Sequence, residues 1–364
     1  MRKTWATALF LTGVAAAVGA QAPAAPATID IRVDSRAARE ILLTLARPKW
    51  EPTDARLLED MPAIALTIRD SARSTEVFER DLKAAYETES RVAVFDFRLV
   101  RETRERWEGL VAALTSREAE LVRQAVTKAA AQLPDDRTVG ARLDVHLSFG
   151  LAGLADHVVA HRPEGGEIMV VDLARALGES EGEPLDSRVG RLSRLMAAEA
   201  FRLAWYAYRS NSPGWGRPEP KLGPLEPLVR VVAEAGPIAT FSVDEAFFPL
   251  STWLKDLQRK SMNDLERAAE RVVASETELD KRVEIMSELK RPDFARRVAA
   301  PAGMFMADGI RQAAGPDGLK STLAGGPRAF FEAYDRATQK NKELPPLSKL
   351  IREKLAAART SSKP

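Results

Sequence analysis

The chain contains no cysteine. Without thiols it cannot form disulfides, use a thiolate nucleophile or hold a metal through sulfur, and a lipoprotein anchor is not expected. Only three histidines occur in 364 residues, so imidazole chemistry is confined to His146, His157 and His161. Any chemistry must otherwise come from carboxylates, hydroxyls, arginine and lysine.

Long hydrophobic runs are also missing, because no segment after residue 20 approaches the roughly 18 uncharged apolar residues that a membrane span requires. Residues 1–20 carry Arg2 and Lys3, then an apolar run, then small residues, which is the pattern of a secretory signal peptide. Residues 21–28 form a Pro/Ala linker. We therefore expect an exported protein, periplasmic or secreted, with no membrane span.

A strong charge of one sign is absent as well. The chain has 54 Lys and Arg against 52 Asp and Glu, and removal of Arg2 and Lys3 with the signal leaves 52 of each. A nucleic-acid partner is not expected, because binding phosphates calls for a net basic surface.

The periodicity of apolar residues predicts a predominantly α-helical α+β fold. Short β-type runs occur at 29–33, 141–149 and 167–172, and helical spacing dominates before and after them. We expect one domain over 29–345, made of a helical N-terminal part (29–135), a small sheet (140–175) and a helical part (188–345). A C-terminal helix and tail follow over 346–364.

One predicted helix carries a carboxylate on its apolar stripe. Positions 192, 195, 203 and 206 are apolar, and Glu199 lies among them. A carboxylate on a core-facing stripe is costly unless it is paired. Arg202, one turn later, is the local partner, so a structural Glu–Arg pair is one explanation of this helix.

A second explanation comes from resemblance. The helix 191–206, placed after a short sheet and a glycine-rich connection, resembles the active-site helix of a bacterial family of zinc-dependent proteases of unknown function, of the zincin type with a His-Glu-x-x-His motif. Further segments resemble that family: 129–134 with the strand 141–149, the strand at 166–173, and the C-terminal pattern at 301–310, 318–319 and 326–334. The resemblance implies a zincin-like fold, with a small β-sheet beside an active-site-type helix.

In such a motif two histidines hold zinc and the glutamate between them activates water. Here residues 198–202 read Ala-Glu-Ala-Phe-Arg. The resemblance therefore places Glu199 at the general-base position, while Ala198 and Arg202 replace the metal ligands and Glu234 matches a third ligand. Arginine does not coordinate metals, so we expect no metal, with Arg202 in place of the zinc charge and bridging Glu199 and Glu234.

Other residues keep alternatives open. His157 and His161 have the spacing of one helical face, which makes them a weak candidate metal pair beside their interpretation as solvated loop residues. His146 is expected on the exposed face of its strand. Trp215, in a Pro/Gly-rich connection, is either a lining residue of a peptide-binding groove or ordinary packing.

The leading hypothesis is an exported pseudo-peptidase of the zincin type that binds a peptide or protein and needs no cofactor. The first alternative is an active metallopeptidase that holds zinc through ligands drawn from His146, His157, His161 or Glu234. The second is an interaction protein of the cell envelope. The sequence leaves the oligomeric state open.

Overall fold

The computed structural model describes residues 28–87, 93–134, 140–151, 156–162, 165–178, 183–216, 218–245, 252–291 and 297–359. The predicted signal peptide and almost all of the linker lie outside these residues. The N-terminal helices are α1 (Arg36–Leu45), α2 (Pro52–Glu59), α3 (Pro62–Asp70), α4 (Thr75–Ala84), α5 (Phe97–Glu102), α6 (Arg104–Ser116) and α7 (Glu118–Ala131).

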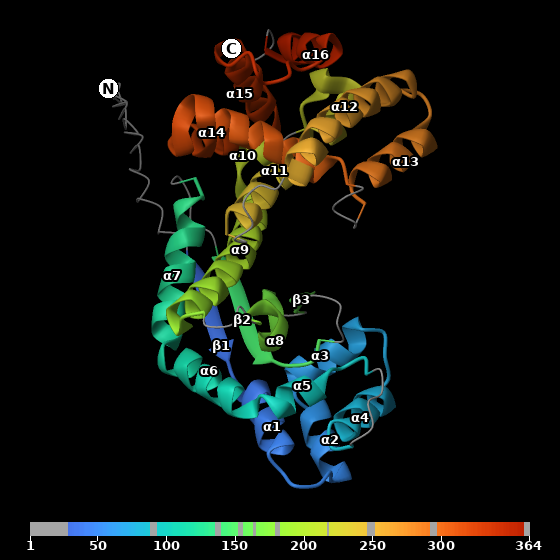
Figure 1. Ribbon diagram of the computed structural model, residues 1–364. Helices are drawn as coiled ribbons and strands as arrows, with labels where there is room; N and C mark the ends of the chain where they lie inside the picture. Colours follow the sequence, from blue (N-terminus) through green and yellow to red (C-terminus); the bar gives the residue numbers. More distant parts are fainter. Residues whose placement is uncertain are drawn as a thin grey trace, which may run out of the picture.

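A four-stranded mixed sheet contains β1 (Thr28–Asp34), β2 (Gly140–Ser148), β3 (His157–His161) and β4 (Glu167–Asp172). The order is β1-β2-β4-β3, with β1, β2 and β4 parallel and β3 antiparallel to β4. Both faces of β2 and β4 are largely buried. The sheet lies between the N-terminal helices α1–α5 below and the long helix α9 (Leu185–Asn211) above, as Figure 1 shows.

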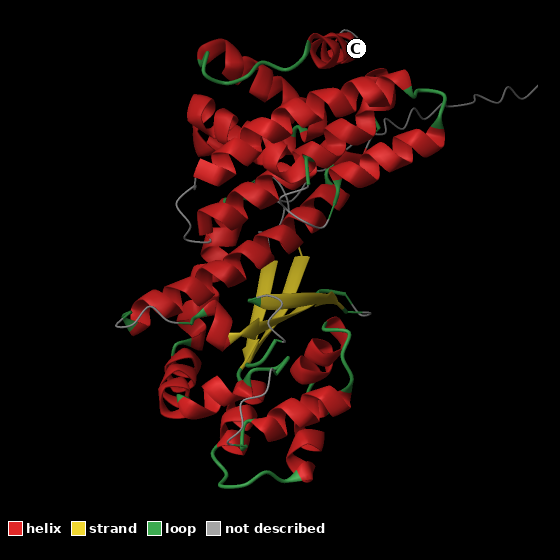
Figure 2. Ribbon diagram, turned by 45° about the vertical axis from the view of Figure 1, so that its right-hand side comes forward, coloured by secondary structure: helices red, strands yellow, loops and turns green. Residues whose placement is uncertain are grey.

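The C-terminal half is a helical lobe (Figures 1 and 2). Its elements are α10 (Pro213–Gly216), the 3-10 turn η1 (Pro220–Leu225), α11 (Glu226–Glu245), α12 (Thr252–Ala274), α13 (Leu279–Leu289), α14 (Ala299–Ala324), α15 (Gly326–Lys340) and α16 (Lys349–Arg359). The short helix α8 (Leu173–Ala176) is not part of this lobe, because it follows β4 directly and lies beside the sheet (Figure 1). The predicted fold class, α+β with helix in large excess, is confirmed.

Two glycines allow a close crossing of α11 and α14 in this lobe. A Cβ on Gly303 of α14 would lie 2.4 Å from the Val232 carbonyl oxygen of α11, and a Cβ on Gly236 would lie 2.5 Å from the Gly303 backbone. Only glycine therefore lets the backbones of α11 and α14 approach this closely. The helix α11 also packs against α9.

Some sequence-based boundaries differ from the structure. The predicted strand at 167–172 is correct to the residue, but β3 was not predicted as a strand. The helix α11 continues through Pro237 to Glu245, and α14 continues to Ala324 across a break at Gly315, where φ is 74°. No described helix is long and apolar enough to cross a membrane.

Candidate functional site

The helix α9 positions the candidate site because its two sides differ in character. One side is buried through Phe201, Trp205 and Tyr208, whose rings pack in series. The other side carries Glu199 and Arg202, which are only partly exposed and face the sheet. The i,i+3 spacing places both charged side chains on one helical face, so this pair follows from local geometry.

Glu199 is held from two directions. Its Oε1 lies 3.4 Å from His157 Nε2 of β3, and its Oε2 accepts a 2.7 Å hydrogen bond from Arg202 Nε. Burial by itself would raise the pKa of Glu199, but the His157 hydrogen bond and the charge of Arg202 hold this pKa below its ordinary value. The carboxylate is therefore stabilised in its ionised form.

Arg202 reaches past Glu199 to the first residue of β4. Its Nη1 donates to Glu167 Oε1 at 3.3 Å, and its Nη2 donates to Glu167 Oε2. The Glu167 side chain is only 2% exposed. Burial would lower the pKa of Arg202, but the two carboxylates raise it above the ordinary value, so the guanidinium remains a fixed cation shared between them.

A second histidine completes the arrangement. His161 is opposite Glu167 in the β3–β4 register, and its Nδ1 lies 2.9 Å from Glu167 Oε1. The five residues His157, Glu199, Arg202, Glu167 and His161 thus form one continuous chain of polar contacts between β3, β4 and α9, which we call the α9–sheet clasp. The clasp ties the edge of the sheet to the helix.

Glu167 was not predicted as a site residue, although it stands as a carboxylate directly before the apolar run 168–171. Glu234 was expected as the second partner of Arg202, and this expectation is wrong. Glu234, on α11, pairs with Arg209, two turns further along α9. The helix α11 packs on the aromatic side of α9, with Phe201 against Phe241 and Trp205 Nε1 donating to the Glu234 carbonyl, whereas Arg202 faces the sheet.

Of the two alternatives for Trp215, the structure shows packing and not a groove: the side chain is 2% exposed, packs edge-on against Trp205 and donates from Nε1 to the Leu323 carbonyl at 2.8 Å. The expectation for His146 needs correction. His146 is buried rather than exposed, with Nδ1 3.5 Å from Asp34 Oδ2. Burial lowers the pKa of His146, since helices pack on both sides of β2.

His157 and His161 lie on the strand β3 and not on a helix or in a loop. Residues four apart share one face of a strand as well as one face of a helix. The structure therefore keeps them on a common side, but each contacts a different carboxylate.

The clasp does not fit a zinc ion. Ala198 offers no ligand atom, Arg202 presents a cation, and both carboxylates already accept hydrogen bonds from that cation. Among the described residues no group of three or more His, Asp or Glu side chains could hold a metal. A zinc site of the usual kind needs three or four neutral or anionic ligands around one point.

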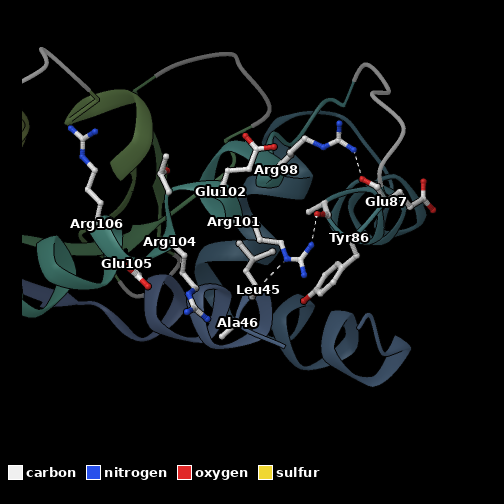
Figure 3. A pocket seen from close by; sticks show the side chains of 12 residues that line it. Leu45, Ala46, Tyr86, Glu87, Arg98, Arg101, Glu102, Arg104, Glu105 and Arg106 are labelled. Atoms are coloured by element: carbon white, nitrogen blue, oxygen red, sulfur yellow. Dashed lines mark hydrogen bonds between the residues drawn. The ribbon is translucent and has the colours of Figure 1, made fainter. Parts of the chain in front are cut away.

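A separate cavity of about 870 Å³ lies away from the clasp, in the N-terminal lobe between α1, α4, α5 and the start of α6 (Figure 3). Arg101 forms part of its wall and donates to the carbonyl oxygens of Leu45, Ala85 and Arg47. Its guanidinium also lies 4.2 Å from the centroid of the Tyr86 ring. Because these contacts tie the ends of α1 and α4 to α5, Arg101 has a structural role in this wall.

Residues 240–343 match a family model described as "Putative zinc dependent peptidase" (DUF5700). This match confirms the resemblance to that family seen in the sequence. The matched segment runs from the end of α11 through α15, so it does not include α9 or the clasp. No curated protein and no solved structure matches the chain.

Proposed function

We propose that this chain, which matches the family of zinc-dependent peptidases over its C-terminal helices, is an exported pseudo-peptidase that binds a peptide or protein partner without metal-dependent hydrolysis. One observation carries the proposal. Arg202, at the position of the motif's second histidine, bridges Glu199 and the buried Glu167. A fixed guanidinium thus supplies the positive charge that a metal supplies in a zinc peptidase.

The electrostatics support this assignment. A dication brought to Glu199 would lie beside the Arg202 cation, and the two charges would repel each other. A metal could bind only if Arg202 left Glu167, which would strip a buried carboxylate of its charge-assisted hydrogen bonds. The clasp is therefore built to keep the helix and the sheet in place rather than to polarise a water molecule.

The first test is the metal content of the purified mature protein. The protein is equilibrated with zinc, dialysed against metal-free buffer and submitted to elemental analysis, with the Glu199→Gln variant treated in parallel. We expect almost no zinc in either. About one zinc per chain in the wild type, lost in Glu199→Gln, would overturn the proposal and support an active metallopeptidase that uses Glu199 with His157.

Peptide binding is tested separately. Unfolded casein labelled with a fluorophore is titrated with the protein, and both anisotropy and the appearance of cleaved fragments are followed. The proposal expects binding without cleavage. Cleavage that a chelator stops would contradict it, while the absence of any binding would favour an envelope interaction protein that recognises folded partners.

Export is tested on the expressed protein. We expect the precursor to lose residues 1–20, because the apolar run ends in small residues at Val18-Gly19-Ala20. Mass spectrometry of the protein recovered outside the cytoplasm measures the new N-terminus. An intact N-terminus in a cytoplasmic fraction would contradict this part of the proposal.

A further inference from the structure

The strand β3 is at one edge of the sheet, and its hydrogen-bonding groups follow a strict alternation. The Arg162 N–H donates to the Gly166 carbonyl, and the Asp172 N–H donates to the Asp156 carbonyl. In an antiparallel ladder the pairs that exchange hydrogen bonds alternate with pairs that do not. Even-numbered residues of β3 therefore bond to β4, while the N–H and C=O groups of His157, Val159 and His161 point away from β4, toward an edge on which no other strand of the described residues pairs.

The two edges of the sheet differ in their protection against further pairing. At the other edge, β1 carries the alternating charges Asp30, Arg32 and Asp34. Charged residues on an edge strand discourage the addition of another strand. The sequence of β3 is His-Val-Val-Ala-His, without any Asp, Glu, Lys or Arg, and its residues are half-buried except for the exposed His161. The β3 edge thus lacks the protection that β1 has.

The outward-pointing residues are also arranged symmetrically. An antiparallel copy of β3 centred on Val159 places Val159 opposite Val159 of the second copy, and His157 opposite His161 of the second copy. All three outward residues then form hydrogen-bonded pairs at once, which is the requirement of a two-fold, self-complementary interface. An unrelated extended segment would satisfy the same edge, but only a second copy meets it with this symmetry and without bringing an unpaired charge.

We propose that the β3 edge is a self-association surface, and that its partner is a second copy of this chain paired antiparallel about Val159. The pairing joins the two sheets into one continuous sheet. Because residues in a hydrogen-bonded pair point to the same side, the two α9–sheet clasps lie on the same face of that sheet. The inference does not depend on the proposed peptide binding.

The interface is short, so its formation depends on concentration. Analytical ultracentrifugation between about 1 and 200 µM covers the range expected of a small interface. We expect the average mass to rise from one chain toward two. A wild-type protein that remains one chain in mass throughout this range would overturn the proposal.

Two matched variants locate the interface. Val159→Pro removes an N–H that points to the open edge and breaks no bond to β4, which is the position where a strand tolerates proline. Val159→Thr keeps the N–H and the branched shape. We expect the dissociation constant to rise at least 10-fold in Val159→Pro and to change less than 3-fold in Val159→Thr. Equal dissociation constants for the two variants would place the interface elsewhere and overturn the proposal.

Amide exchange provides a measurement that does not depend on the variants. In the wild type we expect the N–H groups of His157, Val159 and His161 to exchange more slowly as protein concentration rises, while those of Val158 and Ala160 remain unchanged. If Val159→Pro fails to fold, amide exchange in the wild type decides whether the β3 edge pairs with a second copy. Exchange at Val159 that does not respond to concentration overturns the proposal.

Discussion

The guanidinium of Arg202 is bound to the carboxylate of Glu167, 35 residues earlier in the chain, and joins the helix α9 to the first residue of β4. Arg202 also binds Glu199 on its own helix. One arginine therefore donates hydrogen bonds to two partly or fully buried carboxylates, and the stability of the clasp depends on it.

Replacing Arg202 with methionine leaves Glu167 buried without its guanidinium partner. Because removing one partner of a buried ion pair leaves an uncompensated buried charge, we expect a loss of about 3 kcal/mol in the free energy of unfolding. The double variant Arg202→Met/Glu167→Gln removes that stranded charge and should recover more than about 1 kcal/mol of the loss. Urea unfolding of the wild type, Arg202→Met, Glu167→Gln and the double variant measures the coupling free energy between the two side chains. Additive losses would show that the two side chains do not interact.

The motif can be rebuilt to test what Arg202 replaced. The variant Ala198→His/Arg202→His places two imidazoles four residues apart on α9, with Glu167 beside position 202. We expect it to hold about one zinc per chain after dialysis, since two histidines and a carboxylate form a zinc site. Arg202→His alone, which lacks the second imidazole, is the matched control and should retain much less. A folded double variant that holds no more zinc than the control would show that residues 198–202 do not have the geometry of a zinc motif.

The ionisation of Glu199 predicts a dependence of stability on pH. The folded state lowers the pKa of Glu199 below the ordinary 4.5. Glu199 therefore contributes stability above its unfolded pKa, and this contribution is lost as pH falls through the folded pKa. Near neutral pH, the wild type should unfold at a higher urea midpoint than Glu199→Gln. The difference between the two midpoints should shrink below about pH 4. A difference that stays constant down to about pH 3 would contradict this assignment.

The crossing of α11 and α14 predicts a sharp response to one methyl group. Gly303→Ala would place a Cβ 2.4 Å from the Val232 carbonyl oxygen, so the helices must separate, at a cost of about 1–3 kcal/mol. Gly109→Ala in α6 is the control, because a Cβ there meets nothing within 4 Å and alanine favours a helix by up to about 1 kcal/mol. The melting temperature should fall in Gly303→Ala and rise in Gly109→Ala. A Gly303→Ala protein as stable as wild type would show that the crossing can relax.

Local periodicity was sufficient to predict much of this protein. The apolar stripe of α9, the position of Glu199 on it and the pairing of Glu199 with Arg202 all follow from helical spacing within one segment. The strand at 167–172 was predicted as well, because a run of six residues that is rich in β-branched side chains and follows two glycines favours a strand. The strand β3 was missed, since histidines four residues apart share a face in either structure.

By itself, the sequence determined the predominantly helical α+β class, the absence of thiol chemistry and the local Glu199–Arg202 pair. Only the tertiary structure decided that Glu167 is the second partner of Arg202, that Glu234 belongs to Arg209, and that Trp215 and His146 are buried. The physical reason is that ion pairs and burial between distant segments depend on the packing of helices and sheet against one another. That packing is set by features such as the contact between Gly236 and Gly303, which no single segment contains.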